Sequence, residues 1–93
     1  MNDRVAFQLT IYGHVQGIGY RWFVKDIAKE ENLSGYVKNN QDGTVEIIVE
    51  SDKEEKVNRF IERIKKEHPY AVVKKVEIKK INPTFYDDFI IKF

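Results

Sequence analysis

The residues with the clearest capacity for chemistry lie in the stretch YGHVQGIGYRW, residues 12–22. Gly13, Gly17 and Gly19 come shortly before Arg21. In a glycine-rich turn, successive backbone N–H groups can point toward one place and bind an anion. An arginine beside such a turn adds a charged, forked donor that matches phosphate oxygens. The stretch is therefore a candidate phosphate site.

The place of Arg21 in the chain bears on this interpretation. The residues that follow the turn predict a helix, so Arg21 would lie in its first turn, where a cation is unfavourable. A bound anion would remove that penalty, because it would pair with both the arginine and the free N–H groups. A simple connecting turn with Arg21 in solvent explains the same residues equally well. The known nucleotide-binding patterns are absent, since G-x-x-x-x-G-K-[ST] does not occur and Trp22 takes the place of a third glycine after Gly17 and Gly19.

The first half of the chain predicts three strands and one helix. Alternating apolar residues indicate a strand over residues 5–12, and further strands are expected at residues 36–39 and 45–50. The Asn-Gln-Asp-Gly segment between the last two is typical of a hairpin turn. Apolar residues recur at helical spacing from Tyr20 to Ala28. Asn32 is expected to end this helix, because asparagine tolerates the left-handed conformation that follows a helix.

The second half predicts one helix and two strands. The apolar residues of Val57–Ile64 fall at i, i+3, i+4 and i+7, which indicates a helix with one buried face. An S-x-x-E pattern that begins at Ser51 suggests a capping box at the start of that helix. Residues 72–78 predict a fourth strand in which Lys74 does not fit the alternation, and residues 89–93 predict a short fifth strand.

The predicted order is β-α-β-β-α-β followed by a short strand. It favours an α+β, ferredoxin-like sandwich in which two helices cover one face of a mainly antiparallel sheet. The 93 residues, without linker or repeat, suit a single domain over 1–93. We expect Phe89 and Phe93, on the last strand, to lie in the core. This fold has many unrelated functions, so the activity must be argued from the site.

Composition excludes several kinds of site. The chain has no cysteine, which removes disulfides, thiolate nucleophiles and cysteine-bound metals, and its histidines, His14 and His68, are far apart in sequence. Basic and acidic residues number 16 and 15, so charge does not favour a nucleic-acid or membrane surface. The first residues lack the apolar region of a signal peptide, and no apolar run has the length of a membrane span. We therefore expect a cytoplasmic protein.

The segment GHVQGIGYR, followed by GYVKNNQDGTVEIIVE, resembles the acylphosphatase family. The family pattern is V-Q-G-V-x-[FY]-R after the first strand, then G-[WY]-V-x-N and D-G-x-V-E on the second and third strands. All three elements occur here in order. The match is dense from Val5 to Glu50 and looser through the C-terminus. The chain differs from the family at His14, where arginine is common, and at Asn32 and Ser51, where glycine is usual.

The resemblance implies hydrolysis of acyl phosphates to a carboxylate and inorganic phosphate, without metal or cofactor. Arg21 matches the phosphate-binding arginine of the family, and Asn39 matches the asparagine that orients the attacking water. The backbone that matches the phosphate cradle belongs to Val15, Gln16, Gly17, Ile18, Gly19 and Tyr20. The implied partner is a small-molecule acyl phosphate, with no nucleic acid or membrane, and the protein is expected to be a monomer.

This chemistry requires few side chains. An acyl phosphate is a mixed anhydride whose carboxylate leaving group is stable without protonation, so a general acid is dispensable. The site must hold the phosphoryl group, stabilise its oxygens and place water in line, which an arginine, backbone N–H groups and an amide can do. A site without cysteine or paired histidines is therefore compatible with an enzyme. It favours an activated phosphate over a stable phosphomonoester.

Two other functions stay open at this stage. RNA-recognition domains share the topology, but they carry stacking aromatic residues on the first and third strands. The predicted third strand, GTVEIIVE, has two glutamates and no aromatic residue, which disfavours RNA binding. A non-catalytic, anion-binding regulatory domain would keep the same glycine turn and arginine, and the sequence does not distinguish it from an enzyme.

Overall fold

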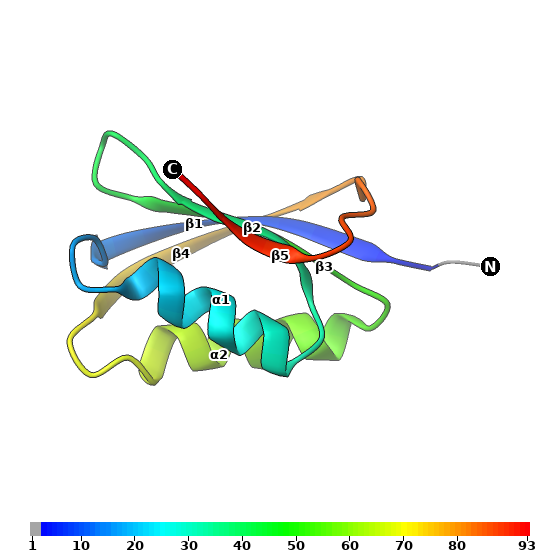
Figure 1. Cartoon of the computed structure of the whole chain (residues 1–93), viewed down its shortest axis with the longest axis horizontal. Helices are drawn as coiled ribbons and strands as arrows, with labels where there is room; N and C mark the ends of the chain where they lie inside the picture. The colour runs from blue at the N-terminus through cyan, green and yellow to red at the C-terminus, as the bar shows by residue number, and fades with distance from the viewer. Residues whose placement is uncertain (1–2) are drawn as a thin grey trace.

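Five strands form one mixed sheet, and two helices pack on one of its faces (Figure 1). This computed structural model describes residues 3–93, so Met1 and Asn2, which belong to the predicted 1–93 domain and to the stretch examined for a signal peptide, lie outside the described residues. The elements are β1 (Val5–His14), α1 (Tyr20–Glu30), β2 (Ser34–Asn39), β3 (Val45–Ser51), α2 (Glu54–Lys66), β4 (Val72–Ile81) and β5 (Phe89–Lys92).

The strand order is β4-β1-β3-β2-β5. All neighbouring strands are antiparallel except β2 and β5, which run parallel. The predicted ferredoxin-like sandwich with two helices on one face is therefore confirmed. Among residues 3–93, no helix is both long enough and apolar enough to cross a bilayer.

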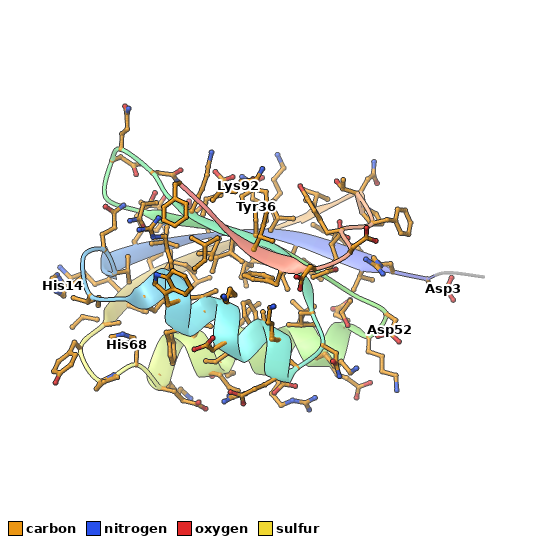
Figure 2. The ribbon with its side chains drawn as sticks, viewed as in Figure 1. Asp3, His14, Tyr36, Asp52, His68 and Lys92 are labelled. Atoms are coloured by element: carbon orange, nitrogen blue, oxygen red, sulfur yellow. The ribbon has the colours of Figure 1, made fainter. Side chains whose placement is uncertain are left out.

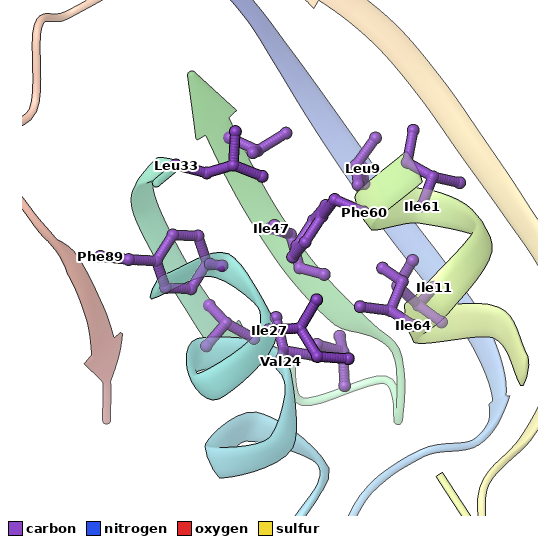
Figure 3. Close-up of a cluster of buried hydrophobic side chains, with 14 of the residues drawn as sticks. Leu9, Ile11, Val24, Ile27, Leu33, Ile47, Phe60, Ile61, Ile64 and Phe89 are labelled. Atoms are coloured by element: carbon purple, nitrogen blue, oxygen red, sulfur yellow. The ribbon is translucent and has the colours of Figure 1, made fainter. Parts of the chain in front are cut away.

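The core fills the space between the sheet and the two helices (Figure 3). Apolar side chains on one face of β1 and β3 pack against the apolar side of each helix. The period of two residues in the strands and of about 3.6 residues in the helices predicts this arrangement. The fully buried residues at the centre include Leu9, Ile11, Val24, Ile47, Phe60, Ile64 and Phe89.

The predicted core position of Phe93 is wrong, since its side chain is 93% exposed. It follows the last ladder pair of an edge strand, Lys92 with Lys38, and its ring meets the guanidinium of Arg21 instead of the core.

The end of α1 agrees with the prediction. Asn32 has a φ of 59°, and its N–H donates to the carbonyl of Lys29, while the N–H of Leu33 donates to the carbonyl of Ala28. These two bonds form the Schellman arrangement that closes a helix. Asparagine thus takes the place of the glycine that is usual in the family without loss of the turn.

The start of α2 differs from the prediction. Ser51 pairs with Val5 and remains in β3, and the helix has Lys53 as its N-cap without any side-chain capping bond. The Ser51 hydroxyl oxygen accepts a hydrogen bond from the Lys53 N–H at 3.1 Å. The predicted capping box at Ser51 is therefore wrong, because pairing with β1 extends the strand and delays the helix.

A bulge explains why Lys74 does not fit the alternation of β4. Tyr12 pairs with Lys75 and Gly13 with Val73, so Lys74 is the extra residue. At this point the two backbones approach so closely that a Cβ on Gly13 would lie 1.9 Å from the carbonyl oxygen of Val72. Gly13 is therefore required by the sheet and not by the turn that follows it.

A buried carboxylate anchors the loop between β4 and β5. Glu50 is 1% exposed and accepts hydrogen bonds from the backbone N–H groups of Thr84, Phe85 and Tyr86 at 2.6, 3.0 and 3.0 Å. Its other partner is the Arg4 guanidinium at 3.2 Å. This anchor holds the loop in the position from which β5 runs alongside β2.

Candidate functional site

The loop between β1 and α1 is built around two glycines with left-handed backbone. Gly17 has a φ of 75°, and Gly19, the N-cap of α1, has a φ of 76°. A Cβ on either residue would meet nothing within 4 Å, so the conformation and not lack of space favours glycine. This conformation brings backbone N–H groups of the loop together with those at the start of the helix.

A cavity of about 180 Å³ lies beside this loop. Its lining residues are Val15, Gly17, Gly19, Tyr20, Arg21, Trp22 and Asn39. Since a water molecule takes up roughly 30 Å³ in the liquid, the cavity has room for a phosphoryl group and a water molecule. The fold thus brings the two predicted catalytic residues, Arg21 from α1 and Asn39 from β2, to the same small space.

Arg21 lies in the first turn of α1, as predicted. Its guanidinium carbon is 4.9 Å from the ring centroid of Phe93, and Nη1 lies 3.5 Å from the carbonyl oxygen of Lys92. Among residues 3–93, no carboxylate forms an ion pair with Arg21. The C-terminal strand therefore positions the guanidinium without neutralising its charge, which suits an anion-binding role.

Asn39 is the last residue of β2. Its side-chain oxygen is buried and has no hydrogen-bond partner among the described residues. A buried polar atom without a partner is uncommon in folded proteins and needs an explanation. Asn39 lines the cavity, and its amide oxygen is of a type that can accept a hydrogen bond from a water molecule.

The other predicted cradle residues fall into two groups. Val15, Gly17, Gly19 and Tyr20 line the cavity, whereas Gln16 and Ile18 are not among its lining residues. The ring of Tyr20 packs in the core, where its hydroxyl donates to the carbonyl of Ile64 at 2.8 Å. Burial raises the pKa of this hydroxyl, so it is not available as an acid or base at the site.

Gln16 has a structural function that sequence reasoning missed. Its side-chain amide donates to the carbonyl oxygens of Asn40 and Thr44 at 2.9 and 2.8 Å. These bonds tie the glycine loop to the turn between β2 and β3, directly after Asn39. The Q of the V-Q-G motif was the only signal, and the motif alone does not reveal which backbone groups it binds.

The same turn explains Asp42. Its carboxylate accepts hydrogen bonds from the Thr44 hydroxyl at 2.6 Å and from the Thr44 N–H at 3.0 Å. These bonds hold the pKa of Asp42 below its usual range. Within residues 3–93, no group of three or more histidine, aspartate or glutamate side chains is arranged to hold a metal ion. Asp42 therefore stabilises a hairpin turn.

The histidine that replaces the usual arginine, His14, is exposed and does not line the cavity. Tyr12, which precedes the loop, also points elsewhere, since its hydroxyl donates to Glu77 at 2.6 Å. Neither side chain reaches the space shared by Arg21 and Asn39. The positive potential of the cavity thus comes from Arg21 and from the N–H groups around the helix start.

Comparison with known proteins gives consistent results. The acylphosphatase family model matches residues 7–91. An acylphosphatase from Thermotoga petrophila is 40% identical over 88 residues, which cover 95% of this chain and 97% of that protein. The crystal structure of acylphosphatase from Bacillus subtilis superposes with a TM-score of 0.91 at 31% identity and covers 96% of this chain and 99% of that one. HypF of T. kodakarensis matches with a TM-score of 0.85 and 43% identity, over 96% of this chain but 12% of that one.

Proposed function

Because this chain belongs to the acylphosphatase family, whose members hydrolyse acyl phosphates, we propose a separate role for each part of its site. Arg21 and the backbone N–H groups of residues 15–20 hold the phosphoryl group, and Asn39 positions the attacking water. The observation that carries this proposal is the shared cavity, which is lined both by Arg21, whose guanidinium has no ionic partner among residues 3–93, and by Asn39, whose buried amide oxygen has no hydrogen-bond partner among the same residues.

The reaction follows from these parts. The water oxygen attacks phosphorus, and the bond between phosphorus and the acyl oxygen breaks, so that its electron pair leaves with the carboxylate. Arg21 and the loop N–H groups stabilise the charge on the equatorial oxygens during this transfer. The proton of the attacking water passes to the phosphate itself. The carboxylate leaves as a stable anion, so the site requires no general acid.

We further propose that the protein acts in the cytoplasm, as a monomer, on a small-molecule acyl phosphate and without a metal ion. The nearly balanced charge and the lack of cysteine support this proposal. The lining of the cavity also supports it, since the described residues that line it include the cation Arg21 and no aspartate or glutamate to hold a divalent cation.

A spectrophotometric assay of benzoyl phosphate hydrolysis, with and without dialysis against EDTA, tests the proposed function. We expect hydrolysis at the same rate in both samples. Activity that returned only on addition of Mg²⁺ or Zn²⁺ would contradict the metal-free reaction. A protein that bound phosphate but left benzoyl phosphate intact would instead be a non-catalytic anion-binding domain.

Replacement of Asn39 by alanine tests the role of the amide. We expect Asn39→Ala to lower kcat about 100-fold, because the attacking water loses its position. The inhibition constant of inorganic phosphate should change little, since Arg21 and the loop remain. Steady-state kinetics with phosphate as a competitive inhibitor would separate the two effects. Asn58→Ala, at an exposed position of α2, is the matched control. If Asn39→Ala lowered the affinity for phosphate as much as it lowered kcat, Asn39 would be assigned to phosphate binding.

Binding of inorganic phosphate should stabilise the fold. The anion would occupy free N–H groups and pair with Arg21 in the native state only, so at 100 times Kd it should stabilise the protein by roughly 2.7 kcal/mol. For a domain of this size, Tm should rise by roughly 4–8 °C per kcal/mol. Thermal melts with phosphate, and with chloride at matched ionic strength, measure this rise. An equal rise in Arg21→Gln would mean that the effect is general salting-out and not binding at this loop.

A further inference from the structure

His68 forms hydrogen bonds that connect the second half of the chain to the loop between β1 and α1. We call this loop, residues 15–19, the phosphate loop. His68 lies in the loop between α2 and β4, and Figure 2 shows it at the same end of the molecule as His14, which ends β1. Its Nε2 is 3.1 Å from the carbonyl oxygen of Ile18, across a separation of 50 residues. Its Nδ1 lies 3.1 Å from the backbone nitrogen of Tyr70 and 3.2 Å from that of Ala71.

These contacts assign the tautomer of the ring. Two backbone N–H groups point at Nδ1, so Nδ1 accepts hydrogen bonds and carries no proton. Nε2 then carries the proton and donates to the carbonyl oxygen of Ile18. The ring is also held by its neighbours, since its centroid lies 5.0 Å from that of Phe23 and 5.8 Å from that of Tyr20. The direction of the Nε2–H is therefore set by both loop and core.

The bond to Ile18 has a consequence for its neighbour in the chain. The carbonyl of Ile18 and the N–H of Gly19 belong to one planar trans peptide unit, so they point in opposite directions. Because His68 holds the carbonyl on its own side, the Gly19 N–H must point away from His68. Gly19 lines the phosphate cavity, and it is the N-cap at the start of α1.

We propose that His68 is a positioning residue that keeps the Gly19 N–H directed into the phosphate cavity. The peptide unit between Ile18 and Gly19 needs such a restraint, because glycines in left-handed conformation lie on both sides of Ile18 and permit rotation of the unit. Without the bond from His68, only a fraction of molecules would present this N–H to the anion. The apparent affinity for phosphate falls in proportion to that fraction.

This proposal rests on the assignment of the cavity as the phosphate site, and a pair of variants tests it. His68→Asn keeps an acceptor near the place of Nδ1, for Tyr70 and Ala71, but is too short to reach Ile18. His68→Gln places an amide nitrogen near Nε2, so it retains a donor to Ile18 and loses the acceptor at Nδ1. The two variants thus separate the restraint on the phosphate loop from the support of the loop after α2.

We expect His68→Asn to raise both the KM for benzoyl phosphate and the Kd of inorganic phosphate between about threefold and tenfold. Its kcat should change less than about twofold, because the lost interaction acts on ground state and transition state alike. His68→Gln should keep KM and Kd within about twofold of wild type, even though it melts at a lower temperature. The phosphate-induced shift of the Gly19 amide resonance should shrink in His68→Asn and persist in His68→Gln.

The opposite ranking would overturn the proposal. If His68→Gln lost as much phosphate affinity as His68→Asn, or if both kept that of wild type, His68 would serve stability alone. Calorimetric titration with inorganic phosphate keeps this test separate from catalysis. A wild-type protein that bound phosphate but did not hydrolyse benzoyl phosphate would refute the proposed function and leave the inference on His68 intact, whereas one that bound no phosphate would refute both.

Discussion

Arg21→Gln is expected to lower kcat/KM for benzoyl phosphate by about 10³-fold or more, while the protein remains folded. Glutamine retains a hydrogen-bond donor on a shorter side chain but has neither the charge nor the forked geometry that stabilises the oxygens of a transferring phosphoryl group. The charge of Arg21 has no carboxylate partner among residues 3–93, so the full effect of its removal falls on the bound anion.

Stability should change little in this variant. Arg21 loses its stacking on Phe93, an interaction worth roughly 0.5–1 kcal/mol at an exposed site. Steady-state kinetics, together with circular dichroism and a thermal melt, would show whether activity is lost without loss of the fold. Arg59→Gln, at an exposed position of α2, is the control for removal of a positive charge. A folded Arg21→Gln protein with kcat/KM within tenfold of wild type would contradict the assignment of Arg21 as the phosphate ligand.

Glu50→Ala is expected to give the largest loss of stability, of roughly 3–5 kcal/mol. Removal of this buried carboxylate leaves the N–H groups of Thr84, Phe85 and Tyr86 without their acceptor and deprives Arg4 of its ionic partner. Each hydrogen bond to a charged group contributes to stability, so the loss of several such bonds at once adds up. For a domain of this size, Tm should fall by at least about 12 °C.

Chemical denaturation of wild type and variant measures this difference directly. Glu55→Ala, at an exposed position in the first turn of α2, should change the free energy of unfolding by no more than about 0.5 kcal/mol. The activity of Glu50→Ala should also fall near its melting transition. The loop that Glu50 anchors leads into β5, and the Lys92 carbonyl of this strand lies beside the Arg21 guanidinium. If Glu50→Ala unfolded at the same denaturant concentration as Glu55→Ala, the loop would be held by other contacts.

Features that depend on neighbours in the chain were predictable. Apolar periodicity predicted the order of strands and helices, and Asn32 ends α1 as expected because the left-handed turn is a local property. Local backbone chemistry also located the glycine loop, since left-handed conformations at Gly17 and Gly19 favour residues without a Cβ. The motifs of the family then selected Arg21 and Asn39, and these two residues line one cavity.

Local patterns misled where pairing across the sheet overrides them. Ser51 has the sequence neighbours of a helix cap, yet its partner Val5 keeps it in β3. Lys74 interrupts an alternating pattern because the close approach at Gly13 inserts one extra residue into β4. Phe93 has the apolar character of a core residue, but it lies beyond the last pair of an edge strand, where it supports Arg21 instead. In each case, the partner is far away in the sequence.

The sequence by itself determined the order of the elements, the fold class and the two residues proposed to bind the phosphoryl group and to position the attacking water. Only the tertiary structure decided which side chains hold those residues in place. Gln16 binds the turn after β2, His68 binds Ile18, and Glu50 binds the loop before β5, and each contact joins segments that the sequence separates widely. A side chain can bind any suitable backbone group that folding brings near it, so such a partner has no signature of spacing or periodicity. It becomes known only when the sheet and helices have placed both groups within hydrogen-bond distance.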